Sequence, residues 1–186
     1  MTVERQLEAL IADGLERSIE NTVPCGAGKI ICEGEELVDF SSNDYLGLAI
    51  DPLLGNQLSQ RALVVGVGSR AARLLSGSRP LLSHFERSFA RMVGKEGSLL
   101  FNSGYHANLG IMSAITEPGS MVFSDSSNHA SIVDGCRLCA ATVETYPHCD
   151  LKALEAQLVA AEAEGRLQRK LTNVVVTEGI FSMDGD

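Results

Sequence analysis

The pattern of apolar and polar positions differs between the first third of the chain and the rest. In the first third, apolar residues recur at helical spacing in two segments, and a third segment holds two short apolar runs separated by a turn. These segments predict an amphipathic helix, a β-hairpin and a second helix, over residues 3–19, 29–40 and about 52–65. The run Pro24–Gly28, with its proline and glycines, is expected to end the first helix. The glycine-rich stretch 66–77 has no clear period.

Beyond residue 80 the pattern alternates between helical segments and short apolar runs. Helices are predicted over 81–93, 105–115, from about 129, and over 150–164. Buried strands are predicted over 98–101, 121–123, 142–146 and 173–177. Strands that alternate with helices form a mainly parallel sheet with both faces covered. The predicted fold class is therefore α/β.

Polar loops follow three of the predicted strands. They cover residues 102–106, 124–129 and 178–186. In an open parallel sheet, ligands bind beyond the carboxyl ends of the strands. The convergence of these loops at one edge of the sheet predicts a ligand site there.

Two positions in these loops have both a functional and a structural interpretation. Gly104 and Tyr105 open a helix, and its first amides and dipole suit a phosphate. Alternatively, Asn102 or Ser103 caps that helix and nothing binds. His129 also follows a strand and begins a helix, where an imidazole can act as an acid or base or lie flat on an aromatic ligand. It is equally explained as a polar residue that starts a helix.

Composition narrows the classes of function. Apolar residues make up 45% and charged residues 21%, as in ordinary globular domains. The net charge of −9 argues against a nucleic-acid binder. No apolar run is long enough for a membrane span, and the charged N-terminus does not resemble a secretory signal, so we expect a cytoplasmic protein without membrane contact.

Cysteine spacing predicts no metal site. The five cysteines are odd in number and irregularly spaced, which favours reduced thiols over a disulfide framework. Cys136 and Cys139 form a C-x-x-C pair without a second pair at zinc-finger spacing. Buried small hydrophobic residues are the simpler interpretation, with metal ligands as the alternative.

A dinucleotide-binding pattern is present without its usual context. Gly66–Ala71 matches G-x-G-x-x-A, and Glu86 lies downstream at a suitable distance. The fingerprint requires a preceding strand, whereas residues 53–63 have a helical pattern. Neither a nucleophile elbow nor a Walker A lysine is found, so hydrolase and nucleoside-triphosphatase functions are not supported.

Five blocks resemble, in order, those of the α-oxoamine synthase family of pyridoxal-phosphate-dependent enzymes. They are residues 40–48, 73–77, 101–108, 128–132 and 176–186. The resemblance implies a fold-type-I, aspartate-aminotransferase-like architecture and a homodimer with its sites at the subunit interface. Residues 1–50 would form an N-terminal helix and hairpin segment, and 51–186 an incomplete large cofactor-binding domain.

The resemblance also assigns cofactor contacts. Gly104 and Tyr105 match positions whose backbone contacts the phosphate of pyridoxal phosphate. His129 matches a catalytic histidine that is stacked on the pyridine ring and also meets the substrate, and Ser182 matches a serine that contacts the cofactor. Arg70 and Ala71 stand where family members commonly have glycine, which argues against a close backbone approach at that point.

Substrate contacts are implied at the other end of the chain. Arg17 matches an N-terminal arginine near the substrate carboxylate, and Asn43 lies in a block that lines the site. Glu178 lies in another such block. No metal ligand is implied.

The implied reaction is a decarboxylative condensation of an amino acid with an acyl thioester, which makes the protein an acyltransferase. The blocks at 40–48 and 177–186 are most similar to the biotin-synthesis member, which uses L-alanine and pimeloyl-CoA or a pimeloyl carrier protein. Residues 128–139 equally resemble the member that joins glycine and acetyl-CoA. A lysine-lacking, non-catalytic partner subunit is a further alternative.

The cofactor's lysine and its aspartate partner are expected beyond Asp186, because none of the four lysines lies in a matching block. The sequence also stops directly after an apolar run and a turn. We therefore expect an N-terminal fragment that is inactive alone.

Overall fold

The computed structural model describes residues 2–186 and divides into two compact units. The first unit is Met1–Ala72 and the second is Arg73–Asp186. The boundary that the sequence suggested at residue 50 falls inside the first unit. No helix in residues 2–186 has the length and apolar character needed to cross a membrane.

The first unit holds two α-helices, a short 3-10 helix and a small antiparallel sheet. Its elements are α1 (Val3–Ala12), β1 (Thr22–Gly26), β2 (Lys29–Cys32), β3 (Glu35–Val38), η1 (Leu48–Ile50) and α2 (Pro52–Val65). α2 has the predicted bounds because Asp51 caps it by accepting from the N–H of Leu53 at 2.8 Å, and Pro52 occupies its first turn.

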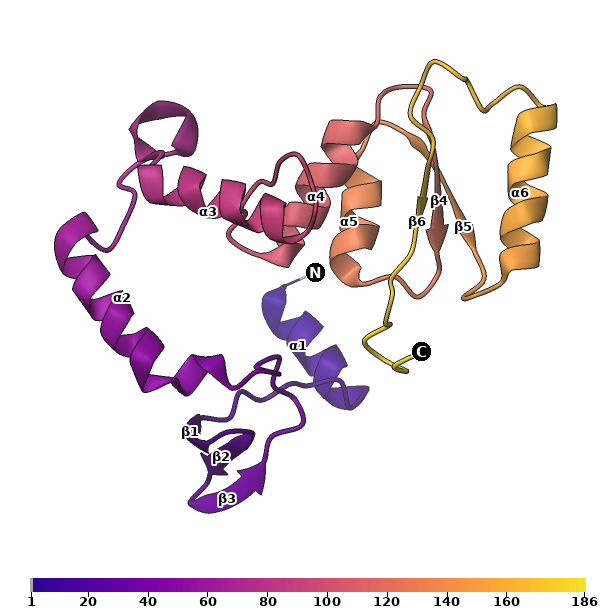
Figure 1. The fold of residues 1–186 in the computed structure, drawn as a ribbon. Coiled ribbons are helices and arrows are strands. Elements are labelled where there is room, and N and C mark those ends of the chain that lie inside the picture. The colour runs from indigo at the N-terminus through magenta and orange to yellow at the C-terminus, as the bar shows by residue number, and fades with distance from the viewer. Residues whose placement is uncertain (1) are drawn as a thin grey trace. The chain divides into compact units, whose positions relative to one another are not determined.

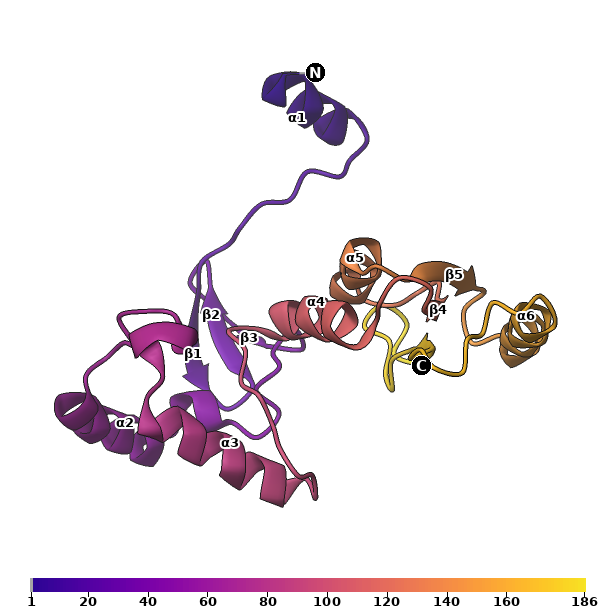
Figure 2. The same cartoon turned by 90° about the horizontal axis from the view of Figure 1, so that it is seen from above.

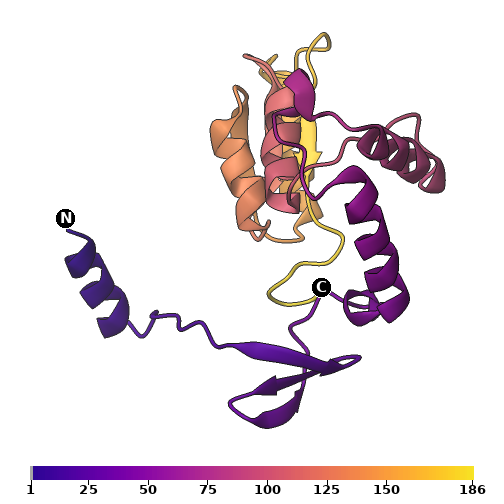
Figure 3. The same ribbon diagram turned by 90° about the vertical axis from the view of Figure 1, so that its left-hand side faces the viewer.

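The first helix is shorter than predicted. α1 ends at Ala12, and Gly14 has a left-handed φ of +67°. The N–H of Leu15 then donates to the carbonyl of Leu10 at 2.8 Å, which closes the helix end. From there an irregular segment leads to the sheet (Figure 3). Helices gain most of their stability by burying an apolar face, and Ile19 is 96% exposed.

The predicted hairpin is part of a three-stranded sheet of order β1-β2-β3. The additional strand, β1, includes Pro24, which was expected only to end a helix. Proline is tolerated there because β1 is an edge strand and has no neighbouring strand on its outer side. The register shifts between Pro24 and Gly26, as at a bulge.

The second unit is an α/β structure, as predicted. It contains η2 (Arg73–Gly77), α3 (Pro80–Met92), α4 (Gly104–Ile115), β4 (Met121–Asp125), α5 (Ala130–Leu138), β5 (Thr142–Tyr146), α6 (Leu151–Ala163) and β6 (Val174–Val176). The sheet order is β5-β4-β6, with both pairs parallel. α4 and α5 lie on one side of this sheet and α6 on the other (Figures 1 and 2).

Two apolar cores hold these layers together. On one face, Met112 of α4 and Ile132 of α5 pack with Val122 of β4. On the other face, Phe123 of β4 packs with Ala161 of α6. All five residues of β4 are buried, so both faces of the central strand are covered.

The segment 98–101 is not a strand, contrary to the prediction. Within residues 2–186 it pairs with no strand, and Leu99 is 65% exposed. It is held instead by α3, because the N–H of Leu100 donates to Glu86 Oε1 at 2.8 Å. Ser98 Oγ donates to the backbone carbonyl of Glu86 at 2.8 Å. An apolar run becomes a strand only when a neighbouring strand accepts its hydrogen bonds.

Candidate functional site

The loops after β4 and β6 meet through Asn128. This residue is 6% exposed, and its Nδ2 donates to Ser124 Oγ at 3.0 Å and to the carbonyl of Val176 at 2.9 Å. Its Oδ1 is buried and has no partner within the described residues. Asn128 thus joins the carboxyl ends of two neighbouring strands and leaves an acceptor unused next to them.

His129 starts α5 and keeps its side chain exposed. Its Nδ1 accepts from the N–H of Ser131 at 3.2 Å, which caps the helix, and lies 2.8 Å from Ser131 Oγ. Its own N–H donates to the carboxylate of Glu178. The structural role considered for this residue is therefore present. It also fixes the ring while leaving Nε2 uncommitted within the described residues.

The N-terminus of α4 is open. Ser103 caps it, with Oγ accepting from the N–H of His106 at 3.2 Å. In the described part of the chain, the N–H groups of Gly104 and Tyr105 have no hydrogen-bond partner. A Cβ built on Gly104 would meet no heavy atom within 4 Å. Free amides at the positive end of a helix, with open space beside them, can hold a phosphate.

Side chains of α4 hold its first turns beside α5. The hydroxyl of Tyr105 donates to the carboxylate of Asp134, a bond that raises the pKa of Tyr105 and lowers that of Asp134. Asn108 Nδ2 donates to Ser131 Oγ at 2.9 Å. These bonds bring Gly104, Tyr105 and the start of α5 with His129 to the same edge of the sheet.

The loop that carries Ser182 follows β6. Ser182 is exposed in a turn, and the turn is closed by its own backbone. The N–H of Phe181 donates to the carbonyl of Asp186 at 3.0 Å, and that of Gly185 to the carbonyl of Phe181 at 2.8 Å. No hydrogen bond joins Ser182 to His129 or to Gly104 in the described residues.

A buried hydrogen-bond network around Asp125, which sequence reasoning missed, lies next to this loop. Asp125, at the end of β4, is 1% exposed and accepts from the N–H of Ser127 at 2.8 Å and of Cys149 at 2.9 Å. His148 Nδ1 lies 2.9 Å from the same carboxylate. Burial acts to raise the pKa of Asp125, but these hydrogen bonds together lower it. The position of Asp125 at a strand end, before Ser126 and Ser127, was the available signal.

The same network brings mixed donor atoms together. Asp125, His148 and Cys149 offer one oxygen, one nitrogen and one sulfur within 4.8 Å of one another. Both carboxylate oxygens of Asp125 already accept hydrogen bonds, so they are committed to the fold.

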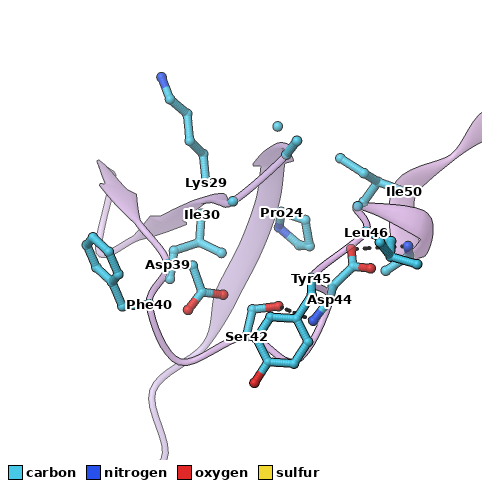
Figure 4. Close-up of a pocket in the computed structure, with 15 residues that line it drawn as sticks. Pro24, Lys29, Ile30, Asp39, Phe40, Ser42, Asp44, Tyr45, Leu46 and Ile50 are labelled. Atoms are coloured by element: carbon cyan, nitrogen blue, oxygen red, sulfur yellow. Dashed lines mark hydrogen bonds between the residues drawn. The ribbon is translucent and has the colours of Figure 1, made fainter. Parts of the chain in front are cut away.

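Arg17 and Asn43 belong to the first unit, and no contact places them at the strand ends. Arg17 is exposed, and Asn43 Oδ1 accepts a long 3.4 Å bond from the hydroxyl of Tyr45. The loop around Asn43 borders a pocket of the first unit (Figure 4). There Ser42 Oγ accepts from the N–H of Asp44 at 2.9 Å, and the Asp44 carboxylate accepts from that of Leu48 at 2.8 Å.

The dinucleotide interpretation is wrong. Gly66 follows a helix, α2, instead of a strand. Glu86 is 9% exposed and forms a two-pronged ion pair with Arg73, at 2.6 and 2.9 Å, so it is not available to a ribose. The hydrogen bonds from Arg73 and from the N–H of Leu100 lower the pKa of Glu86 to about 2.

Comparison with known proteins relates this fold to one large family. The model of the aminotransferase class I and II family matches residues 35–186. An 8-amino-7-oxononanoate synthase of Anaeromyxobacter sp. (strain K) is 47% identical over 181 residues, which are 97% of this chain and 44% of that protein. The enzyme of the same name from Geobacter sulfurreducens is 43% identical over 185 residues, which are 100% of this chain and 46% of that protein.

Solved structures of similar enzymes resemble this chain as well. Sphingomonas wittichii serine palmitoyltransferase is 28% identical with a TM-score of 0.82, over 99% of this chain and 45% of its own. A structure of SPT with PLP is 27% identical with a TM-score of 0.82 at the same coverage. 8-Amino-7-oxononanoate synthase from Francisella tularensis is 28% identical with a TM-score of 0.57, over 79% of this chain and 38% of its own. The chain spans about half the length of the curated relatives it matches.

Proposed function

The chain belongs to the aminotransferase class I and II family, and we propose that it carries part of the pyridoxal-phosphate site of an 8-amino-7-oxononanoate synthase. This acyltransferase of biotin synthesis would condense L-alanine with a pimeloyl thioester, either pimeloyl-CoA or a pimeloyl carrier protein. The products would be 8-amino-7-oxononanoate, CO2 and the free thiol. The names of relatives at 42–47% identity support the proposal.

The observation that carries the proposal is the open N-terminus of α4. The free N–H groups of Gly104 and Tyr105 would hold the cofactor phosphate, and the empty space at Gly104 would let it approach the backbone. When bound, pyridoxal phosphate supplies an electron sink for the carbon next to the amino group of the substrate.

His129 would lie against the cofactor ring. Its Nδ1 is fixed by the cap on Ser131, so the plane of the imidazole is set by the start of α5. Its Nε2 stays free to hold a proton near the substrate, which is the catalytic role proposed for it. Ser182 would offer its hydroxyl to the cofactor from the loop after β6. Both roles depend on orientation, and oriented groups lower barriers chiefly by removing the entropy of alignment.

The first unit would supply contacts to the substrate. Arg17 is proposed to bind the substrate carboxylate, because a guanidinium pairs with a carboxylate through two parallel hydrogen bonds. Asn43 is proposed to line the same site. The enzyme is further proposed to be a cytoplasmic homodimer. Residues 1–50 would act as a separate segment ahead of the cofactor-binding domain.

Residues 1–186 alone are proposed to be inactive. The four lysines are Lys29, Lys95, Lys152 and Lys170. None lies in a loop after β4 or β6 or at the start of α4. A lysine that bonds the cofactor would have to come from outside these residues.

A substrate panel tests the proposed function. The whole protein that carries residues 1–186 is assayed with L-alanine, glycine and L-serine, each against pimeloyl-CoA and acetyl-CoA. We expect the highest kcat/KM for L-alanine with pimeloyl-CoA. A preference for glycine with acetyl-CoA would replace the proposal by a 2-amino-3-ketobutyrate ligase. Binding of pyridoxal phosphate without turnover of any pair would favour a non-catalytic partner subunit.

A further inference from the structure

His148 lies between two carboxylates that come from distant parts of the second unit. Its Nδ1 is 2.9 Å from Asp125 Oδ1 at the end of β4, and its Nε2 is 3.0 Å from Asp186 Oδ2. Its ring also meets the ring of Phe181 edge-on, with centroids 4.4 Å apart. One imidazole therefore contacts both the central strand and the loop that follows β6.

This arrangement requires the charged form of His148. A neutral imidazole has one N–H, whereas both ring nitrogens here face carboxylate oxygens and must both donate. Asp125 is 1% exposed, and a buried carboxylate is stable only with hydrogen bonds and a compensating charge. Consistent with this geometry, the hydrogen bonds to Asp125 and then to Asp186 raise the pKa of His148.

The two residues that His148 contacts beyond β6 form the base of one loop. The backbone bonds between Phe181 and Asp186, and between Gly185 and Phe181, close that loop upon itself. Phe181 is 4% exposed, whereas Met183 in the turn is 90% exposed. His148 thus holds both ends of the closed turn, and Ser182 is the first residue of the turn after the base.

We propose that protonated His148 is a positioning residue that clamps the loop Phe181–Asp186 to the end of β4 and thereby places Ser182. The link to Ser182 rests on the proposed function; the clamp itself does not. The charged and titratable groups that face His148 are Asp125 from β4, Asp186 from the loop, and the adjacent Cys149. No cation faces it in the described residues.

The clamp has a defined dependence on pH. The pKa of His148 is higher in the folded chain than in the unfolded one. The stabilisation is therefore complete below the ordinary histidine pKa of about 6.5 and is lost as the pH rises through the raised value. Above that value Nε2 has no proton, and its lone pair opposes the carboxylate of Asp186.

Amide hydrogen exchange tests the clamp. NMR measures the exchange at each pH together with the titration of the four histidine rings. We expect the protection factors of the Phe181 and Gly185 amides to fall at least about tenfold across the titration of His148, because a hydrogen bond between charged groups is lost. The His84→Gln variant is the matched control, because His84 is exposed on α3. Protection that stays constant while His148 titrates would overturn the proposal.

Two variants separate charge from packing. His148→Gln has one side-chain nitrogen, where the imidazole has two that face different carboxylates. It should lower loop protection at every pH. Asp186→Asn replaces a carboxylate that is 52% exposed, so little loss of folding is expected. Its amide can accept from a protonated ring or donate to a neutral one. Loop protection in Asp186→Asn should therefore no longer depend on the charge of His148; an unchanged dependence would contradict the clamp.

A double-mutant cycle on the whole protein tests the link to Ser182. If His148 acts through Ser182, the losses of pyridoxal-phosphate affinity in Ser182→Ala and His148→Gln will be less than additive. Additive losses would overturn this link. Absence of pyridoxal-phosphate binding in the unmodified protein would overturn the proposed function and leave the exchange result intact.

Discussion

His129 shows how one side chain meets a structural and a chemical demand together. Its Nδ1 caps α5 and its backbone N–H is bound by Glu178, so both the start of the helix and the plane of the ring are determined. The two interpretations open at the sequence level are thus compatible. The helix cap uses one edge of the imidazole, and the proposed contact with the cofactor uses the face of the ring.

Substitutions at His129 can separate these two demands. His129→Asn keeps a good N-cap but removes the ring, so we expect unchanged unfolding free energy and a loss in kcat/KM of about a hundredfold. His129→Ala loses both, with an additional cost in stability of about 1 kcal/mol. Chemical denaturation gives the unfolding free energy of both variants, and steady-state kinetics of the whole protein gives their kcat/KM. Near-normal turnover in His129→Asn would leave only the capping role.

Whether a feature could be predicted from the sequence depends on how far apart the residues that form it lie along the chain. The helix start at Gly104 and Tyr105 was predicted because a polar residue followed by glycine is a short-range pattern. Their contact with the cofactor was implied by the resemblance and stays a prediction. Asp125 and His148 were missed because their contact joins residues 23 positions apart and depends on the register of β4 with β5. The ion pair of Glu86 with Arg73 was also missed, since it joins residues 13 positions apart and no local pattern reveals it.

At the scale of elements, most helices and strands follow their apolar periodicity, and two of the failures share one cause. β4, β5 and β6 and the helices between them were predicted because each buries an apolar face against a neighbour. α1 stops early and 98–101 is no strand because, within the described residues, these apolar positions stay exposed. Periodicity predicts an element only when the fold supplies a partner for it.

The close packing of α4 against α5 gives a prediction at this scale. A Cβ on Gly135 would lie 3.0 Å from both the backbone carbonyl of Asn108 and Met112 Cγ. Gly135→Ala should therefore push the helices apart and lower stability by about 1–3 kcal/mol. Gly97→Ala is the control, because its Cβ meets nothing within 4 Å. Urea denaturation compares the two variants; equal stabilities would show that the helices are not packed this closely.

At the scale of the whole molecule, the α/β class and the parallel sheet could be predicted from alternation alone, and the family from the five matching blocks. The division at residue 72 could not, because composition does not change there. The substrate contacts of Arg17 and Asn43 rest on the family resemblance alone and stay predictions. Contacts between distant segments, such as that of His148 with Asp186, depend on parts of the fold that the sequence pattern does not encode.

The central claim is that the start of α4 holds the phosphate of pyridoxal phosphate, and Gly104→Asp tests it most directly. An acidic residue in the first helical turn is favourable for folding, so the variant should unfold at the same temperature as the unmodified protein. Its carboxylate would occupy the open space where the phosphate is proposed to bind. Gly97→Asp adds the same charge at an open position away from the strand ends.

The measurement is the dissociation constant of pyridoxal phosphate, and of pyridoxal without its phosphate, for the whole protein and both variants. We predict that Gly104→Asp weakens binding of pyridoxal phosphate by about a hundredfold or more, since like charges in contact cost several kcal/mol. Binding of pyridoxal should change far less, and Gly97→Asp should behave as the unmodified protein. An unchanged affinity of Gly104→Asp for pyridoxal phosphate would contradict the account.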